Sequence, residues 1–185
     1  MRYIFLTLVL ASFSFAQPLS LGKPNEEKVH SPWLNIGIGM GILSPASSPK
    51  YEKQASAFVN PSFLVGIQFA ELTALTFEFD FTAPHGGVGG WVGLEQQFME
   101  TEITPFAEFQ AGARYPGSHK RSGSVFGPAG SLNGGFIFFR ESPFRVRLKC
   151  GYEMILNDDY DMSWNAEVGF LFAFGRPGLQ EIRVD

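Results

Sequence analysis

Large apolar side chains alternate with small or polar residues along most of this chain. In the segment 33–42 the apolar residues fall on every second position, and asparagine and glycines fill the positions between them. A period of two is the spacing of a β-strand, whereas a helix would scatter these residues around its circumference. The pattern therefore predicts a strand. Its apolar residues are Leu34, Ile36, Ile38, Met40 and Ile42.

The same alternation recurs in seven further segments. It is clearest at 73–83, where Leu75 and three phenylalanines alternate with threonine, glutamate and aspartate. It is less clean at 103–115 and 131–139, where Phe106, Ile137 and Phe139 fall among the small and polar positions. The eight predicted strands are 33–42, 58–70, 73–83, 91–98, 103–115, 131–139, 144–156 and 164–174.

The predicted connections alternate between long and short. The short ones lie at 71–72, 99–102 and 141–143. The longer ones lie at 43–57, 84–90, 116–130 and 157–163. Short turns on the periplasmic side and longer loops outside are typical of small outer-membrane barrels. The predicted fold class is therefore all-β, an eight-stranded antiparallel up-and-down transmembrane β-barrel.

The size of such a barrel decides which face points inward. The interior of an eight-stranded barrel is just wide enough for side chains, so roughly four to six large apolar residues from each strand would overfill it. Glycine on a solvent-facing strand surface would also weaken the strand without any gain, as at Gly37, Gly39 and Gly41. We therefore expect the apolar face to contact lipid. The opposite arrangement, a secreted or periplasmic soluble barrel that binds an apolar ligand, stays open as an alternative.

Charged residues on the polar face are expected to pair across the lumen and to plug it, since lone buried charges are costly. A cation on the lipid face would cost about 2–4 kcal/mol at the midplane. Trp33, Trp91, Tyr115 and Trp164 stand at strand ends, as expected of interfacial aromatic belts. The predicted lumen network consists of Glu78, Asp80, Glu95, Glu108, Arg145, Arg147, Lys149, Glu153 and Glu167.

With its eight strands, unequal connections and aromatic final strand 168–174, the chain resembles the small eight-stranded outer-membrane barrels typified by the transmembrane domain of outer-membrane protein A. The resemblance covers 33–174 and rests on architecture. It implies that Phe174 ends the barrel as part of the assembly signal, while the tail 175–185 departs from that pattern. It also implies a role in envelope integrity, adhesion or surface recognition, so we expect a non-enzymatic structural or surface-interaction protein.

The first residues look like an export signal. Arg2 is followed by the mostly apolar run 3–13, and Ser14-Phe15-Ala16 places small residues before a cleavage point at Gln17. We expect 1–16 to be removed, 17–32 to form a flexible periplasmic leader, and 175–185 to be a periplasmic tail. The expected location is the outer membrane of a Gram-negative-type cell.

Composition narrows the classes of partner and function that the chain can have. Charged residues make up 17% of the 185 residues and the formal net charge is −4, with no basic stripe, which disfavours nucleic acid as a partner. The single cysteine, Cys150, lies among apolar neighbours and is interpreted as an inert apolar side chain. No cofactor is expected, and outer-membrane lipid is the expected partner.

Two predicted outer loops carry candidate chemistry. His119, Lys120 and Arg121 could meet lipopolysaccharide phosphates or another extracellular ligand electrostatically. A lipid-modifying enzyme, a second alternative, would need a serine held against His119; Ser118, Ser122 and Ser124 flank it. A polar loop without catalysis is the favoured interpretation, and no catalytic residue is predicted.

An acidic loop and a glycine-rich loop give weaker indications of a binding site. Asp158, Asp159 and Asp161 offer oxygen ligands, but the calcium-loop spacing with its glycine and distant glutamate is missing, so a turn is favoured and no metal site is predicted. The run 85–90 is rich in glycine, yet it joins two strands rather than a strand and a helix. We interpret it as a turn.

Overall fold

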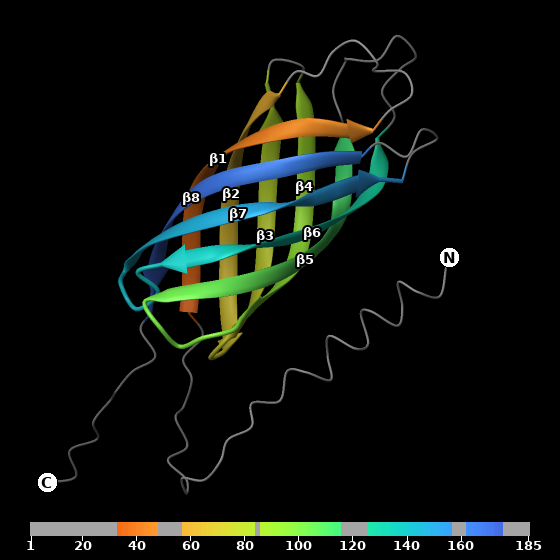
Figure 1. The fold of residues 1–185 in the computed structure, drawn as a ribbon. Helices are drawn as coiled ribbons and strands as arrows, with labels where there is room; N and C mark the ends of the chain where they lie inside the picture. The colour runs from red at the N-terminus through yellow and green to blue at the C-terminus, as the bar shows by residue number, and fades with distance from the viewer. Residues whose placement is uncertain (1–32, 48–56, 84–85, 116–125, 157–161, 176–185) are drawn as a thin grey trace, which may run out of the picture.

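A computed structural model describes residues 33–47, 57–83, 86–115, 126–156 and 162–175. Eight antiparallel strands close into a barrel, in which each strand pairs with its sequence neighbours and the last pairs with the first (Figure 1). The predicted fold class is therefore confirmed. The strands are β1 (Trp33–Ser47), β2 (Phe58–Ala70), β3 (Thr73–Thr82), β4 (Gly87–Gln97), β5 (Ile103–Tyr115), β6 (Gly127–Phe138), β7 (Phe144–Ile155) and β8 (Met162–Phe174).

The strands cross the barrel at a steep tilt, as closing a sheet on itself requires. In Figure 1 the strands on the near side run across those on the far side. The connections 71–72, 98–102 and 139–143 lie at one end, called the turn end here. The strand ends that the other four connections join lie at the opposite end, called the loop end. Among the described residues, no helix is long and apolar enough to cross a membrane.

The glycine-rich run does not form the expected turn. Gly87 to Gly90 are part of β4 and pair with β3, so that only 83–86 connect the two strands. The inward-facing Gly89 makes this pairing possible, because a Cβ there would come within 2.8 Å of the Asp80 carboxylate and the Trp91 indole nitrogen. The predicted long connection 84–90 is therefore wrong, and the regular alternation of long and short connections does not hold.

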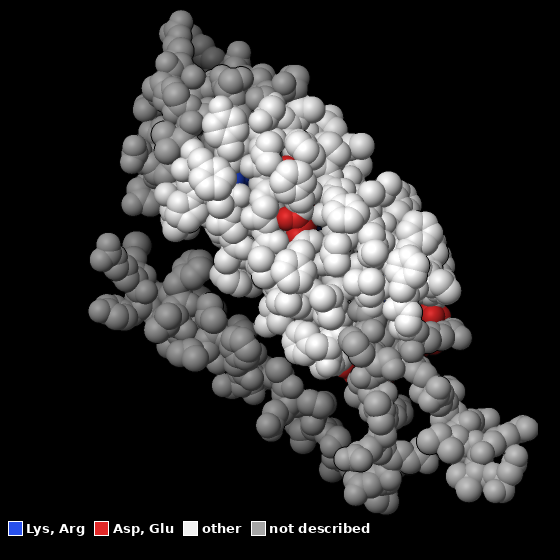
Figure 2. All heavy atoms as spheres, turned by 180° about the vertical axis from the view of Figure 1, so that it is seen from behind, with Lys and Arg blue, Asp and Glu red and all other residues white. Residues whose placement is uncertain are grey.

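The apolar faces of all eight strands point outward. Phe69 is 56% exposed and Leu132 is 65% exposed, whereas Glu108 is 1% exposed. On the face seen in Figure 2, the described surface is almost free of charged side chains, and only a few acidic patches and one basic spot interrupt it. The barrel thus has an apolar outside and a polar inside.

The interior nevertheless contains some large apolar side chains. Leu64, Phe106, Ile137 and Leu171 are buried there, in the half of the barrel near the turn end. Trp91 also lies inside, so its predicted place in an interfacial belt is wrong. β4 begins at Gly87, so Trp91 lies mid-strand, and it shares the inward face with Gly93, Glu95 and Gln97.

Two adjacent glycines of β6 give a direct test of this packing. A Cβ at the inward-facing Gly135 would overlap the carbonyl oxygen of Leu148, whereas a Cβ at Gly134 would lie 3.6 Å from the Phe106 oxygen. We expect Gly135→Ala to lower the free energy of unfolding by about 1–3 kcal/mol. Gly134→Ala should change it by less than about 0.5 kcal/mol. Urea unfolding in detergent micelles measures both, and equal losses would contradict the packing.

Candidate functional site: a charged network inside the barrel

The structure places every member of the predicted lumen network in the barrel interior. Each is less than a tenth exposed. A further buried cation, Arg114 of β5, lies among them. Successive side chains of a strand point to opposite faces, and these residues occupy the positions whose side chains face the lumen. Together the buried charged residues are six acids and four bases: Glu78, Asp80, Glu95, Glu108, Glu153 and Glu167, with Arg114, Arg145, Arg147 and Lys149.

The layer nearest the loop end is organised around Arg114. Its Nη1 lies 3.0 Å from Asp80 Oδ1 on β3, and its Nε lies 3.1 Å from Glu153 Oε1 on β7. Its Nη2 donates to the Thr82 hydroxyl at 2.6 Å. The indole nitrogen of Trp91 donates to the second oxygen of Asp80 at 2.6 Å. One guanidinium thus joins two carboxylates from different strands.

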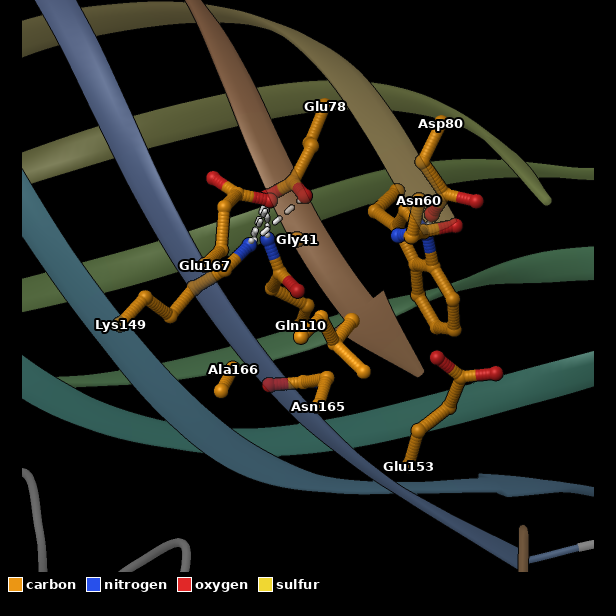
Figure 3. A pocket seen from close by; sticks show the side chains of 12 residues that line it. Gly41, Asn60, Glu78, Asp80, Gln110, Lys149, Glu153, Asn165, Ala166 and Glu167 are labelled. Carbon is orange, nitrogen blue, oxygen red and sulfur yellow. Dashed lines mark hydrogen bonds and ion pairs between the residues drawn. The ribbon is translucent and has the colours of Figure 1, made fainter. Parts of the chain in front are cut away.

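The middle layer is organised around Lys149 of β7. Its ammonium lies 2.6 Å from a carboxylate oxygen of Glu78 and 3.4 Å from one of Glu167 (Figure 3). The Gln110 amide donates to Glu78 at 2.9 Å, and the Ser62 hydroxyl donates to Glu167 at 3.0 Å. β3 and β8 are therefore held to β7 through a single cation.

A glycine on β1 makes room for this middle layer. A Cβ at Gly39 would come within 2.6 Å of the Glu167 carboxylate and would also overlap the Ser62 hydroxyl. Any larger residue at this position would displace the hydrogen bond between Ser62 and Glu167. The other two glycines on this face of β1 border different groups: Gly37 lies against Leu171, and Gly41 lies closest to the backbone oxygen of Ala166.

The layer nearest the turn end is organised around Arg147, which is 1% exposed. Its Nε lies 3.1 Å from Glu95 Oε2, and its Nη2 lies 2.7 Å from Glu108 Oε2. The guanidinium carbon also lies 4.5 Å from the centre of the Phe106 ring, within range of a cation–π contact. The inward position of Phe106, which disturbs the alternation in the sequence, therefore provides a contact surface for this cation.

Arg145 lies below this layer, toward the turn end. Its guanidinium donates to the Asn35 side chain of β1 at 3.1 Å and to the Ser142 carbonyl at 3.4 Å. Arg145 is 2% exposed, so the interior is occupied by charged side chains down to this level.

A small cavity separates the first two layers. Asp80 and Glu153 lie on one side of it, and Lys149 with its two carboxylates lies on the other (Figure 3). The cavity has space for about one water molecule. Side chains thus fill the described interior almost completely.

Charge pairing is the common feature of the buried charged residues. All six carboxylates lie within hydrogen-bond or ion-pair distance of a cation or a polar side chain. Among the residues that the structure describes, no group of three histidine, cysteine, aspartate or glutamate side chains could hold a metal ion. The loop candidates lie outside the described residues: His119, Lys120, Arg121, Asp158, Asp159 and Asp161.

The sequence contained a signal for one residue that the predicted network missed. Arg114 follows Glu108, Gln110 and Gly112 at a spacing of two, so the alternation already placed it on the inward face. The same signal existed for Trp91, which precedes Gly93, Glu95 and Gln97 at a spacing of two. No sequence pattern indicated that Arg114 would pair with both Asp80 and Glu153.

Comparison with known proteins supports the architecture. No family model matches the sequence, and no curated protein sequence is significantly similar to it. The N-terminal β-barrel domain of Pseudomonas aeruginosa OprF is similar in structure, with a TM-score of 0.56 and 11% identity, over 78% of this chain and 100% of that domain. Neisserial surface protein A has a TM-score of 0.56 and 11% identity, over 77% of this chain and 97% of its own.

A third similar structure is Ail, the attachment invasion locus protein of Yersinia pestis, in complex with the heparin analogue sucrose octasulfate. It has a TM-score of 0.51 and 15% identity, over 78% of this chain and 99% of Ail. The chain therefore has the fold of the small eight-stranded outer-membrane β-barrels, and the predicted resemblance is confirmed at the level of the fold.

Arg147 gives a test of the ion pairs. We expect Arg147→Met to lower the free energy of unfolding by about 3–5 kcal/mol, because Glu95 and Glu108 would remain buried without their cation. A triple variant that adds Glu95→Gln and Glu108→Gln should regain most of this loss. Denaturant titration in micelles measures both. If the triple variant were no more stable than Arg147→Met, packing rather than unpaired charge would explain the effect.

Proposed function

We propose that this chain is a non-enzymatic integral outer-membrane protein whose lumen is closed by the charged network, and which acts in envelope structure or surface interaction through its outer loops. The observation that carries the proposal is the division between an apolar outer surface and buried ion pairs. A soluble protein would have the opposite distribution, since large exposed apolar patches are rare on soluble monomers.

The closed sheet supports a place in the membrane. Every strand is paired on both sides, including β1 with β8, so no sheet edge presents unpaired backbone groups to hydrocarbon. The outward phenylalanines come from most of the strands, among them Phe77 and Phe170. This is the surface that a bilayer solvates and water does not.

The orientation follows from the connections. The turn end would face the periplasm, together with the leader 17–32 and the tail 175–185, after export directed by residues 1–16. The loop end would face outward. The expected cell type is Gram-negative, in line with the organisms of the similar barrels.

The surface role rests on the outer loops. Ail was crystallised with a heparin analogue, which is a sulfated sugar. In this chain His119, Lys120 and Arg121 fall between β5 and β6 and would supply positive charge at the loop end. We propose that they contact lipopolysaccharide phosphates or another anionic extracellular ligand.

If the barrel spans a bilayer, a charged residue on its outer face should destabilise it more near the middle of the bilayer than near the bilayer surface. Phe77 lies midway along β3 and faces outward, whereas Phe98 lies exposed at the turn end. We expect Phe77→Arg to lower the free energy of unfolding from phospholipid vesicles by about 2–4 kcal/mol and Phe98→Arg to lower it by about 0–1 kcal/mol. Tryptophan fluorescence during urea titration in vesicles measures both. A soluble barrel would need no detergent and would show no such gradient.

A closed lumen predicts poor conductance. In planar lipid bilayers, the purified protein should give no large steady single-channel current, because layers of charged and apolar side chains fill the interior. Folding of the reconstituted sample is checked by the shift in gel mobility on heating. Large stable currents from folded protein would contradict the closed lumen, although they would leave the membrane location unaffected.

A further inference from the structure

Arg140 contacts all three connections at the turn end. It lies in the 139–143 connection itself, and its backbone amide donates to the carbonyl of Glu102 in the 98–102 connection at 3.2 Å. Its Nη2 donates to the carbonyl of Glu71 in the 71–72 connection at 2.7 Å. The Gln68 side chain donates to the same carbonyl. One arginine therefore ties together three segments that are far apart in the sequence.

The barrel order shows that this contact spans the mouth. In the closed ring β1 to β8, the β6–β7 connection lies directly opposite the β2–β3 connection, with four strands between them on either side. A side chain that joins these two connections must cross the end of the lumen. The side chain of Gln97 at the end of β4, 2% exposed, lies along the way, and its Oε1 accepts from Arg140 Nε at 2.9 Å.

The backbone at Phe139 turns Arg140 inward. Continued alternation along β6 would place position 139 inside the barrel, because Ile137 is buried. Instead Phe139 has a φ of 59° and is 55% exposed, and it is the one non-glycine residue with positive φ in the described part of the chain. A bulky residue rarely adopts this conformation, and such strain persists where surrounding contacts hold it. Here it exchanges an inward phenylalanine for an inward arginine.

Arg140 is also connected to the charged network. The Gln97 amide that lies against it donates to Glu95 at 3.0 Å, and Glu95 pairs with Arg147. The contacts thus run from the turn end to the Arg147 layer without a break. Loss of Arg140 would leave Gln97, and then Glu95, open to water from this end.

We propose that Arg140 is a clasp that closes the turn-end mouth of the lumen and shields the Arg147 layer from water. This inference rests on the proposed function, because it specifies where the closed lumen is sealed on the periplasmic side. In the closed state the clasp holds 71–72, 98–102 and 139–143 as one unit. Its release would loosen all three connections together, while the paired strands stay intact.

Hydrogen exchange tests the clasp in the full-length protein. The backbone amide of Gln97 donates to the carbonyl of Leu72 at 2.7 Å and therefore reports on the 71–72 connection, far in sequence from position 140. We expect Arg140→Ala to raise the exchange rate of this amide by roughly tenfold or more, together with that of the amide at position 140. Exchange is measured by NMR in micelles, with the heat-dependent gel shift as the check of folding.

Two further variants complete the design. Arg140→Lys keeps the positive charge but loses the forked donor, so it should give an intermediate rise. It also keeps the test valid if Arg140→Ala does not fold. Glu100→Gln changes an exposed residue of the same end and should leave exchange at Gln97 unchanged.

The outcomes separate this inference from the proposed function. Faster exchange at both positions 97 and 140 supports the clasp, whereas a rise confined to 139–143, or none, overturns it. Bilayer recordings of the unsubstituted protein test the closed lumen. If this protein gives no current while exchange in Arg140→Ala is unchanged, the closed lumen stands and the clasp is rejected. Large currents from the unsubstituted protein would reject the closed lumen and the clasp with it.

Discussion

Charge pairing across a narrow lumen is the constraint on which the rest of this structure depends. Ten ionisable side chains are buried in the barrel, where unpaired charges would each be costly. β7 supplies three of the four cations at alternate positions, and each one reaches different strands. Arg145 contacts β1, Arg147 contacts β4 and β5, and Lys149 contacts β3 and β8. Except for the contact of Lys149 with Glu167 on the adjacent β8, these pairs connect strands that do not neighbour one another in the sheet, which hydrogen bonds between adjacent strands cannot do.

The same constraint explains the small and apolar residues of the interior. The buried carboxylates need space beside them, and glycines on neighbouring strands provide it: a Cβ at Gly39 would collide with the carboxylate of Glu167 on β8, and one at Gly89 with that of Asp80 on β3. Apolar side chains fill the remaining volume at both ends, among them Phe106 and Leu171 toward the turn end and Phe58 and Ile155 toward the loop end. The Arg147 guanidinium lies against one of them, the ring of Phe106.

Much of the site was accessible from the sequence because alternation is a local property. Nine interior charges were predicted from period two alone, and the same rule would have included Arg114. The ends of the strands were harder to predict from the sequence. The glycines at 87–90 favour a turn by composition, yet they pair as part of β4, since a long partner strand and inward side chains that need room decide the outcome. The misplaced start of β4 in turn put Trp91 at a strand end, where a residue of an aromatic belt would lie, although alternation gives it the inward face of Gly93 and Glu95.

The sequence by itself determined the fold class, the number of strands, and which face of each strand is apolar, because each of these depends on residues only a few positions apart. Only the tertiary structure decided which charges meet, since Arg114, Asp80 and Glu153 come from three strands whose relative level depends on the tilt and register of the closed sheet. It likewise decided the position of Arg140, whose partners lie across the diameter of the barrel. Contacts through the lumen follow from closure, and closure is a property of all eight strands together.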